Sequence, residues 1–498
     1  MSNLHNLAIG FILVFLAFLV VVGIWAGRKN KAGSNNETVE YFLGGKSTPM
    51  IVLAMSYAAS AVSAGSFIGD PGVMSTVGWP YYWIAIATVA GTAIPGIWII
   101  RKMRLQSEKF GSLTVIDYCS KRYQSPKLKV YLSLLMVICF LFTMVAQFKG
   151  AAILLEMYTG ISFNTGLVVM LVVVVFFVNS GGLRSVAWTD FFMGCFMTVM
   201  SVTLVIAAIS YIGGFNGMEA ALDADHPTFN QVVEQGSESE ALITWFGLPM
   251  LFIYGFFIMF SQPYITARYI ALPDVNKKSV GKFLIIAIVT AMLFNFMFIV
   301  GMAGRVGFPD AEGDYMTVTV STEIFPPIIA CVIMIGFFSA IVSTATSILL
   351  VVGQAIGGDI YGKFAKKSTP KKEIRVTQIS TIVIALIVFA FNMVEPPAFL
   401  QVFIYLGLTG VGSSMCMSLY CGVLWKKSRR EGAWAAAILG PVSYLLWTEV
   451  WGLSWASGMG IAVVGAAIGM FGVSWILNAV KGPDKELMEW ADPFIDPK

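Results

Sequence analysis

The sequence predicts an all-α polytopic membrane protein with about thirteen transmembrane helices. Hydrophobic residues make up 57% of its 498 residues, and charged residues make up only 12%. No soluble domain has this balance, and the mean hydropathy of +0.79 agrees. The apolar residues form separate segments of roughly 20 residues or more, which is the length that a helix needs to cross a bilayer. Basic residues gather in alternate connections between these segments, so the net charge of +4 indicates membrane topology and not a nucleic-acid partner.

The expected spans follow one another with short connections. The first apolar run has no basic leader and no small-residue cleavage site, so we interpret it as a retained span and not as a signal peptide. The neighbouring glycines at 181 and 182 separate the fifth and sixth spans. In chain order, the expected spans are 7–27, 50–77, 79–100, 128–158, 162–180, 188–213, 241–268, 282–304, 324–356, 375–393, 397–425, 431–450 and 456–480.

The charge pattern predicts the orientation in the cell membrane. Of the 32 lysines and arginines, only Arg305 lies on the side opposite the others, while Lys149 lies within a span. Arg268 is counted with the basic connections, at the end of the seventh span. The connection 214–240 has acidic residues but no lysine or arginine. Because basic connections stay in the cytoplasm, we expect the N-terminus outside and the C-terminus in the cytoplasm.

The second span has features that spoil a plain helix. Small and hydroxyl residues recur along it, and Asp70, Pro71 and Gly72 are expected to interrupt it. Broken backbone survives at membrane depth only where it faces protein, water or an ion. The alternative is a tight helix–helix seam, since small residues let spans pack closely. The small and hydroxyl residues are Ser56, Ser60, Ser63, Gly65, Ser66 and Gly69.

The ninth span has the matching chemistry. Ser343 and Thr344 are adjacent, and the Ala340 carbonyl lies one turn earlier. Small hard cations are bound by oxygen atoms of this kind. An intact helix has no free carbonyls, so further ligands are expected from unwound backbone of the second span at Ala59 and Val62. The pair predicts a monovalent-cation site at mid-membrane; the alternative is that Ser343 and Thr344 bond back to their own helix.

Five short motifs then occur in order along the chain, and on them it resembles the sodium:solute symporter family over nearly its whole length. Within that family it is most similar to the sodium/pantothenate branch. The motifs are Glu-Tyr-Phe-Leu-Gly-Gly at 40–45, Ser-Phe-Ile-Gly-Asp-Pro-Gly at 66–72, Gly-Gly-Leu-Arg-Ser-Val-Ala-Trp-Thr-Asp at 181–190, Gln-Pro-Tyr-Ile-Thr-Ala-Arg at 262–268, and Ser-Thr at 343–344 followed by Gly-Asp-Ile-Tyr at 358–361.

The resemblance implies a single transporter domain that works by alternating access. One helix, 7–27, precedes two inverted repeats of five helices, 50–213 and 241–425, and two helices within 431–480 follow. It also implies sodium as the co-transported ion. Carried over by position, the sodium ligands are the carbonyls of Ala59, Val62 and Ala340 and the hydroxyls of Ser343 and Thr344.

Asp190 matches the family's acidic position after Trp-Thr, which lies near the sodium pathway. The alternative is that it caps a helix. Two departures stand out. Met193 replaces a frequent glutamine, and the fourth span lacks the family's usual arginine, although Lys149 lies on the same helical face.

Lys149 and Asp70 are expected at similar depth, toward the outside. A lysine within a span indicates function unless it reaches the headgroups. Lys149 therefore faces Asp70, binds an anionic solute or snorkels to the headgroups. Asp70 and Asp190 are our candidates for coupling or gating. The candidate solute-binding side chains are Ser60, Ser63, Tyr81, Lys149, Tyr254, Gln262 and Tyr405.

The predicted function is sodium-coupled import of a small organic solute, with pantothenate or a related monocarboxylate favoured. The alternatives are a sodium/proline-type amino-acid symporter and a membrane solute sensor of the same fold. Proton coupling through Asp70, Glu156 or Asp190 is a further alternative. An enzyme is not expected, because both histidines lie outside the spans and the six cysteines lack metal-ligand spacing. The expected partners are the solute and membrane lipid.

Overall fold

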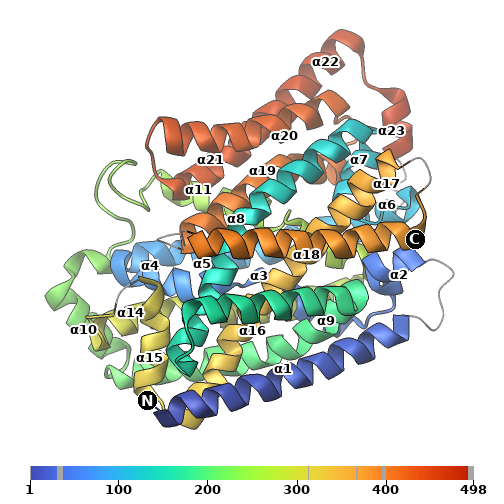
Figure 1. Cartoon of the computed structure of the whole chain (residues 1–498). Coiled ribbons are helices and arrows are strands. Elements are labelled where there is room, and N and C mark those ends of the chain that lie inside the picture. The colour runs from blue at the N-terminus through green and yellow to red at the C-terminus, as the bar shows by residue number, and fades with distance from the viewer. Residues whose placement is uncertain (1, 31–36, 312, 366–367, 395–399, 492–498) are drawn as a thin grey trace.

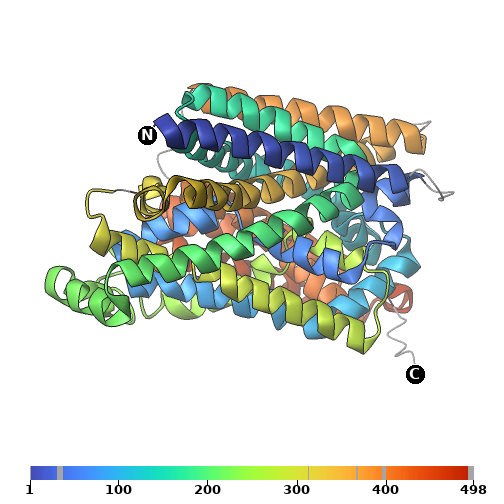
Figure 2. The same cartoon turned by 90° about the horizontal axis from the view of Figure 1, so that it is seen from below.

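Every regular element in the described part of the chain is helical. The computed structural model describes residues 2–30, 37–311, 313–365, 368–394 and 400–491, and no strand occurs among them. The helices lie side by side in one bundle, and α1 runs along most of its length (Figures 1 and 2). The all-α prediction is confirmed. The predicted repeat 241–425 includes residues 312, 366, 367 and 395–399, which lie outside the described residues.

The helices are α1 Ser2–Asn30, α2 Glu37–Leu43, α3 Met50–Ala61, α4 Asp70–Val77, α5 Tyr82–Ala93, α6 Gly96–Phe110, α7 Val115–Arg122, α8 Pro126–Thr159, α9 Phe163–Tyr211, α10 Gly214–Asp225, α11 Gly247–Tyr254, α12 Pro263–Ile270, α13 Lys277–Asn295, α14 Phe298–Gly307, α15 Met316–Ile324, α16 Pro327–Gln354, α17 Gly362–Phe364, α18 Pro370–Val394, α19 Leu400–Leu424, α20 Arg430–Leu445, α21 Trp455–Ala467, α22 Val473–Lys481 and α23 Lys485–Ala491.

The number of membrane crossings depends on how bent helices are counted. Among the described residues, 8 helices are long and apolar enough to span, or up to 11 if each bent pair is one span. α9 has 49 residues, and its backbone is not helical at Gly181 and Gly182. At roughly 1.5 Å per residue it is far longer than one crossing, so its two arms correspond to the expected spans 162–180 and 188–213. The count of thirteen remains a prediction.

The turn inside α9 requires glycine. Gly182 has a φ of 62°, and a Cβ atom there would lie 2.2 Å from the Tyr41 carbonyl oxygen. Only glycine adopts this conformation without strain and also allows so close a backbone approach. The turn folds the second arm of α9 back and so places Asp190 in the middle of the bundle.

The second span is broken at Val62, where unwound backbone was expected, and not at residues 70–72. α3 ends at Ala61, Val62 is extended, and the two halves Met50–Ala61 and Gly65–Val77 are bent by 58°. The expected interruption at residues 70–72 is wrong. A π-helical turn, Gly65–Gly69, leads directly into α4, and Pro71 lies in the first turn of α4, where a missing N–H group costs no helical bond.

The seventh span is broken as well. Its halves, Gly247–Met259 and Pro263–Ile270, are bent by 50°. Pro263 lacks an N–H donor and begins α12 after an extended Gln262. The first helix of each predicted repeat is therefore discontinuous. Such paired interruptions are typical of transporters built from inverted repeats.

The two ends of the bundle differ in charge. α6, α7, α17 and α23 lie at one end, with the basic connections, and α10 with the acidic connection lies at the other (Figure 1). α1 begins at the acidic end, whereas α23 lies at the basic end. This separation supports the predicted orientation, in which the acidic end is extracellular.

Labelling of single cysteines tests the orientation. In a variant whose six native cysteines are replaced, Ser239→Cys is expected to react with a membrane-impermeant maleimide on intact cells. Lys485→Cys is expected to react only after permeabilisation. Both native side chains are exposed, so access to the reagent decides the result. The reverse pattern would contradict the orientation.

Candidate functional site

The five predicted cation ligands lie together where α16 crosses the break after α3. The Ser343 hydroxyl donates to the Ala59 carbonyl at 2.9 Å and to the Ala340 carbonyl at 3.1 Å. The Thr344 hydroxyl donates to the carbonyls of Val62 and Ser60, the latter at 3.2 Å. All five side chains and the surrounding backbone are buried.

The geometry follows from where α3 ends. The last carbonyls of a helix have no intrahelical partner, and at this depth water does not replace one. The hydroxyls of α16 satisfy them instead. The interpretation in which these hydroxyls bond only to their own helix is wrong, because Thr344 bonds across to α3 and Ser343 bonds both ways. If the two hydroxyl protons turned away, a cation could replace these hydrogen bonds, with carbonyl and hydroxyl oxygens together around it.

A buried ion pair lies beside these ligands. The Asp190 carboxylate accepts hydrogen bonds from Ser56 at 2.7 Å, from Ser60 at 3.2 Å and from the Arg268 guanidinium at 3.0 Å. Arg268 also donates to Ser60 and Ser347, at 2.9 and 2.6 Å. The side chains of Asp190 and Arg268 are both 0% exposed. Asp190, in the second arm of α9, thus belongs to a buried hydrogen-bond network between helices and does not cap a helix.

Arg268 was missed as a functional residue. Its position at the end of the seventh span suggested a basic connection, but the break before Pro263 turns α12 back into the bundle. The one sequence signal was its place at the end of the motif 262–268. Burial of a guanidinium requires a paired carboxylate, and Asp190 supplies it.

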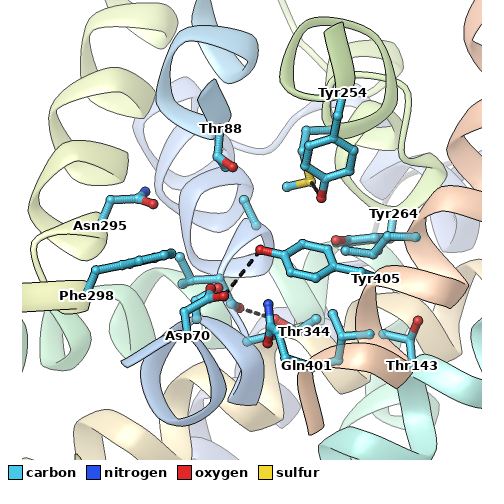
Figure 3. A pocket seen from close by; sticks show the side chains of 17 residues that line it. Asp70, Thr88, Thr143, Tyr254, Tyr264, Asn295, Phe298, Thr344, Gln401 and Tyr405 are labelled. Carbon is cyan, nitrogen blue, oxygen red and sulfur yellow. Dashed lines mark hydrogen bonds between the residues drawn. The ribbon is translucent and has the colours of Figure 1, made fainter. Parts of the chain in front are cut away.

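A small enclosed cavity adjoins the predicted cation ligands (Figure 3). Its volume is about 30 Å³, well below the roughly 150 Å³ of a cavity that holds benzene, so a solute fits only after the walls move. Val62 and Thr344 belong both to the cavity wall and to the predicted cation site. The other polar and aromatic residues that line it are Ser63, Ser66, Asp70, Thr88, Thr143, Tyr254, Tyr264, Asn295, Phe298, Gln401 and Tyr405.

The predicted solute-binding residues divide into two groups. Ser63, Tyr254 and Tyr405 line the cavity, and Tyr81 reaches it through a 2.7 Å hydrogen bond to Asp70. Ser60 differs from the prediction because its hydroxyl belongs to the Asp190 network. Gln262 also lies elsewhere, since its amide donates to the Leu408 and Ile258 carbonyls.

Lys149 lies outside the cavity and does not face Asp70. Its ammonium group forms an ion pair of 3.2 Å with Asp314. Asp314 lies in a short turn, Gly313–Tyr315, between α14 and α15, and also accepts from the Leu400 N–H group at 3.4 Å. Sequence reasoning compared only residues within spans, so this partner was missed. Asp70 instead accepts from Tyr81 at 2.7 Å and from Tyr405 at 3.3 Å.

A discontinuous helix facing an intact one at mid-bundle, with convergent oxygens between them, is the arrangement of an ion-coupled secondary transporter. The sequence model of the sodium:solute symporter family matches residues 41–440, and the chain belongs to this family.

Two curated relatives cover nearly the whole chain. The sodium/pantothenate symporter of Escherichia coli is 30% identical over 449 residues, which are 87% of this chain and 89% of the relative. The osmoregulated proline transporter OpuE of Bacillus subtilis is 25% identical over 481 residues, which are 95% and 94% of the two chains.

Solved structures agree in fold. A Na⁺-coupled sialic acid symporter in a substrate-bound outward-open state has a TM-score of 0.78 at 19% identity, covering 94% of this chain and 98% of that one. The nucleobase-cation-symport transporter Mhp1 has a TM-score of 0.55 at 15% identity, covering 90% and 97%. The fold is the inverted-repeat transporter fold. The chain is an integral membrane protein that imports a solute by coupling to sodium, and it is not an enzyme.

Asp190→Asn is expected to lower the thermal stability of the purified protein, because Arg268 is then buried without a counter-charge. Breaking a buried pair in this way costs roughly 3–5 kcal/mol. Addition of Arg268→Gln is expected to recover part of the loss. Thermal unfolding followed by size-exclusion chromatography measures both effects.

The matched control for this change is Glu37→Gln. Glu37 pairs with Lys371 at the surface, where the side chains are 51% and 83% exposed. Exposed pairs contribute at most about 1 kcal/mol. Equal stability of the Asp190→Asn and Glu37→Gln variants would show that the buried pair has no such role.

Proposed function

We propose that sodium binds between the end of α3 and the middle of α16, and that the solute binds in the adjoining cavity. Five neutral oxygens suit a monovalent cation: the carbonyls of Ala59, Val62 and Ala340 and the hydroxyls of Ser343 and Thr344. The observation that supports this most is the shared wall. Val62 and Thr344 would contact the ion and also line the cavity.

This shared wall gives a physical route to coupling. Sodium would hold α3 against α16 and so fix the extended segment at Val62 and Ser63, which the solute would contact. Each ligand would then raise the affinity for the other by the same factor, and such coupling is typically about 5- to 150-fold. A membrane solute sensor would need to bind its solute but would not need to carry a sodium ion across with it.

Asp190 and Arg268 are our candidates for the gate on the basic side of the ion. Ser60 connects the two sites, because its carbonyl accepts from Thr344 and its hydroxyl accepts from Arg268. Loss of the ion would let the Thr344 hydroxyl donate to the Ser60 carbonyl, as it does in this structure. A change in the position of Ser60 would then disturb the Asp190–Arg268 ion pair, and separation of that pair would open a path for the ion toward the basic end of the bundle.

The solute is a small organic molecule with a carboxylate, because both groups of relatives are named for such solutes. Pantothenate or a related monocarboxylate is the class that the sequence favours, and proline-like amino acids are the alternative. Hydroxyl and amide donors on the cavity wall suit a carboxylate: Ser63, Ser66, Thr88, Asn295 and Thr344.

Uptake into proteoliposomes tests the proposed ion site. Ser343→Ala and Thr344→Ala are each expected to raise the sodium concentration for half-maximal uptake by about tenfold or more, because each removes an oxygen ligand and leaves carbonyls of the α3 break unpaired. Radiolabelled pantothenate and proline, with and without a sodium gradient, are the probes.

Ser339→Ala is the matched control. Ser339 is buried on the same helix one turn earlier, but its hydroxyl donates only to its own helix, at Ile335, 2.7 Å away. Its sodium dependence is expected to equal that of the native protein. Unchanged sodium dependence in the Ser343→Ala and Thr344→Ala variants would place the ion elsewhere.

A further inference from the structure

Asp70 is the one carboxylate among the described residues that line the cavity. It is 3% exposed and lies at the start of α4, where it points into the cavity (Figure 3). Its hydrogen-bond partners are neutral: the hydroxyls of Tyr81 and Tyr405, and the amide of Gln401. The cavity therefore contains a buried carboxyl group whose described partners carry no positive charge.

No lysine, arginine or histidine occurs among the described lining residues. The buried cations Lys149 and Arg268 are already paired, with Asp314 and Asp190 respectively. A carboxylate in a low-dielectric site is costly unless a cation or several donors compensate it. Neutral donors compensate Asp70 in the closed form, and an incoming cation would do so more strongly.

A second acceptor lies beside this carboxylate. The Gln401 side-chain oxygen is buried, lines the cavity and has no hydrogen-bond partner. Two glycines of the broken span make room for it: a Cβ at Gly65 would lie 2.4 Å from this oxygen, and one at Gly69 would lie 2.8 Å from it. A buried acceptor without a donor that also faces a cavity is placed to accept a hydrogen bond from a ligand.

Aromatic rings surround the same end of the cavity. The Tyr405 ring stacks on Trp455 at 5.1 Å between centroids and meets Tyr254 edge-on at 5.8 Å. The Tyr81 ring stacks on Phe298 at 5.8 Å. Aromatic faces attract ammonium and quaternary ammonium groups, and a carboxylate among such rings strengthens that attraction.

We propose that the transported solute is zwitterionic and that its positively charged nitrogen pairs with Asp70. This inference rests on the proposed function. The nitrogen lies between Asp70 and the Gln401 oxygen, against the ring of Tyr405. The carboxylate of the solute lies by Val62 and Thr344, where the positive charge of the bound sodium ion would attract it. The site thus favours amino acids and betaines over pantothenate, whose amide nitrogen is uncharged.

The opposed charges also select against the wrong solutes. A monocarboxylate without a positive group would be repelled by Asp70 and would leave the Gln401 oxygen unpaired, and unpaired buried groups give strong discrimination. A simple organic cation would pair with Asp70, but its other end would face the sodium ion. Only a molecule with both charges satisfies the two ends together.

Pairs of solutes that differ only in charge test this inference. The native protein in proteoliposomes is offered L-proline against tetrahydrofuran-2-carboxylate, glycine betaine against 3,3-dimethylbutyrate, and pantothenate. The expected result is sodium-driven uptake of a zwitterionic member at least about tenfold above its anionic partner and above pantothenate. Preferred uptake of an anionic partner or of pantothenate would overturn the inference.

The variants then locate the selectivity. Asp70→Asn is expected to reduce kcat/KM for the zwitterionic solute by about tenfold or more, and Tyr405→Phe to reduce it less, because the ring remains. Asp310→Asn, at an exposed aspartate near the same end of the bundle, is the control and is expected to match the native protein. Sodium-dependent thermal stabilisation shows that each variant is folded.

Each failure has its own signature. Uptake without sodium dependence in the native protein would refute the proposed symport. Sodium-driven uptake with zwitterionic and anionic solutes equally reduced in Asp70→Asn, together with weaker sodium affinity, would assign Asp70 to an inorganic cation and overturn the inference alone. Unchanged uptake and selectivity in Asp70→Asn would overturn it as well.

Discussion

Backbone polar groups freed inside a membrane must find partners, and this requirement shapes the centre of the protein. α3 stops at Ala61, and its released carbonyls at Ala59, Ser60 and Val62 are taken up by two hydroxyls of α16. The Ala64 N–H group beyond the break donates to Gln147 of α8 at 3.0 Å. The break is therefore held from two sides, and it joins the two predicted repeats by hydrogen bonds that an ion could replace.

Buried charge follows the same logic but with different solutions. Arg268 and Asp190 neutralise one another in the core, and Lys149 and Asp314 do so nearer the acidic end. In both pairs a fixed cation already faces the carboxylate. Asp70 differs, because only neutral groups donate to it. The contrast supports our assignment of Asp70 to a mobile partner, since a fixed cation would have served if structure alone were at stake.

Local chemistry could be predicted from the sequence, and long-range pairing could not. The Ser-Thr pair and the small-residue span together predicted the cation site, because helical spacing puts the oxygens of each on one face of its helix. Unwound backbone at Val62 was expected, but the interruption at Asp70 and Pro71 was wrong, because the proline begins a helix. Arg268 and Asp314 were missed for a common reason. Arg268 lies at a predicted span end and Asp314 in a predicted connection, and only the bend at Gln262 and the turn at Gly313–Tyr315 bring them inward.

Ser60 explains why the ion and the charge network need to be so close. One residue presents its carbonyl to Thr344 and its hydroxyl to Asp190 and Arg268. Because the two groups share one backbone position, the ion would constrain the angle at which the hydroxyl meets the ion pair. A sodium ion that leaves would release that angle, whereas one that stays would keep the pair closed. Coupling of this kind needs no long pathway, since the discontinuity in α3 would be both the proposed ion site and the joint that moves.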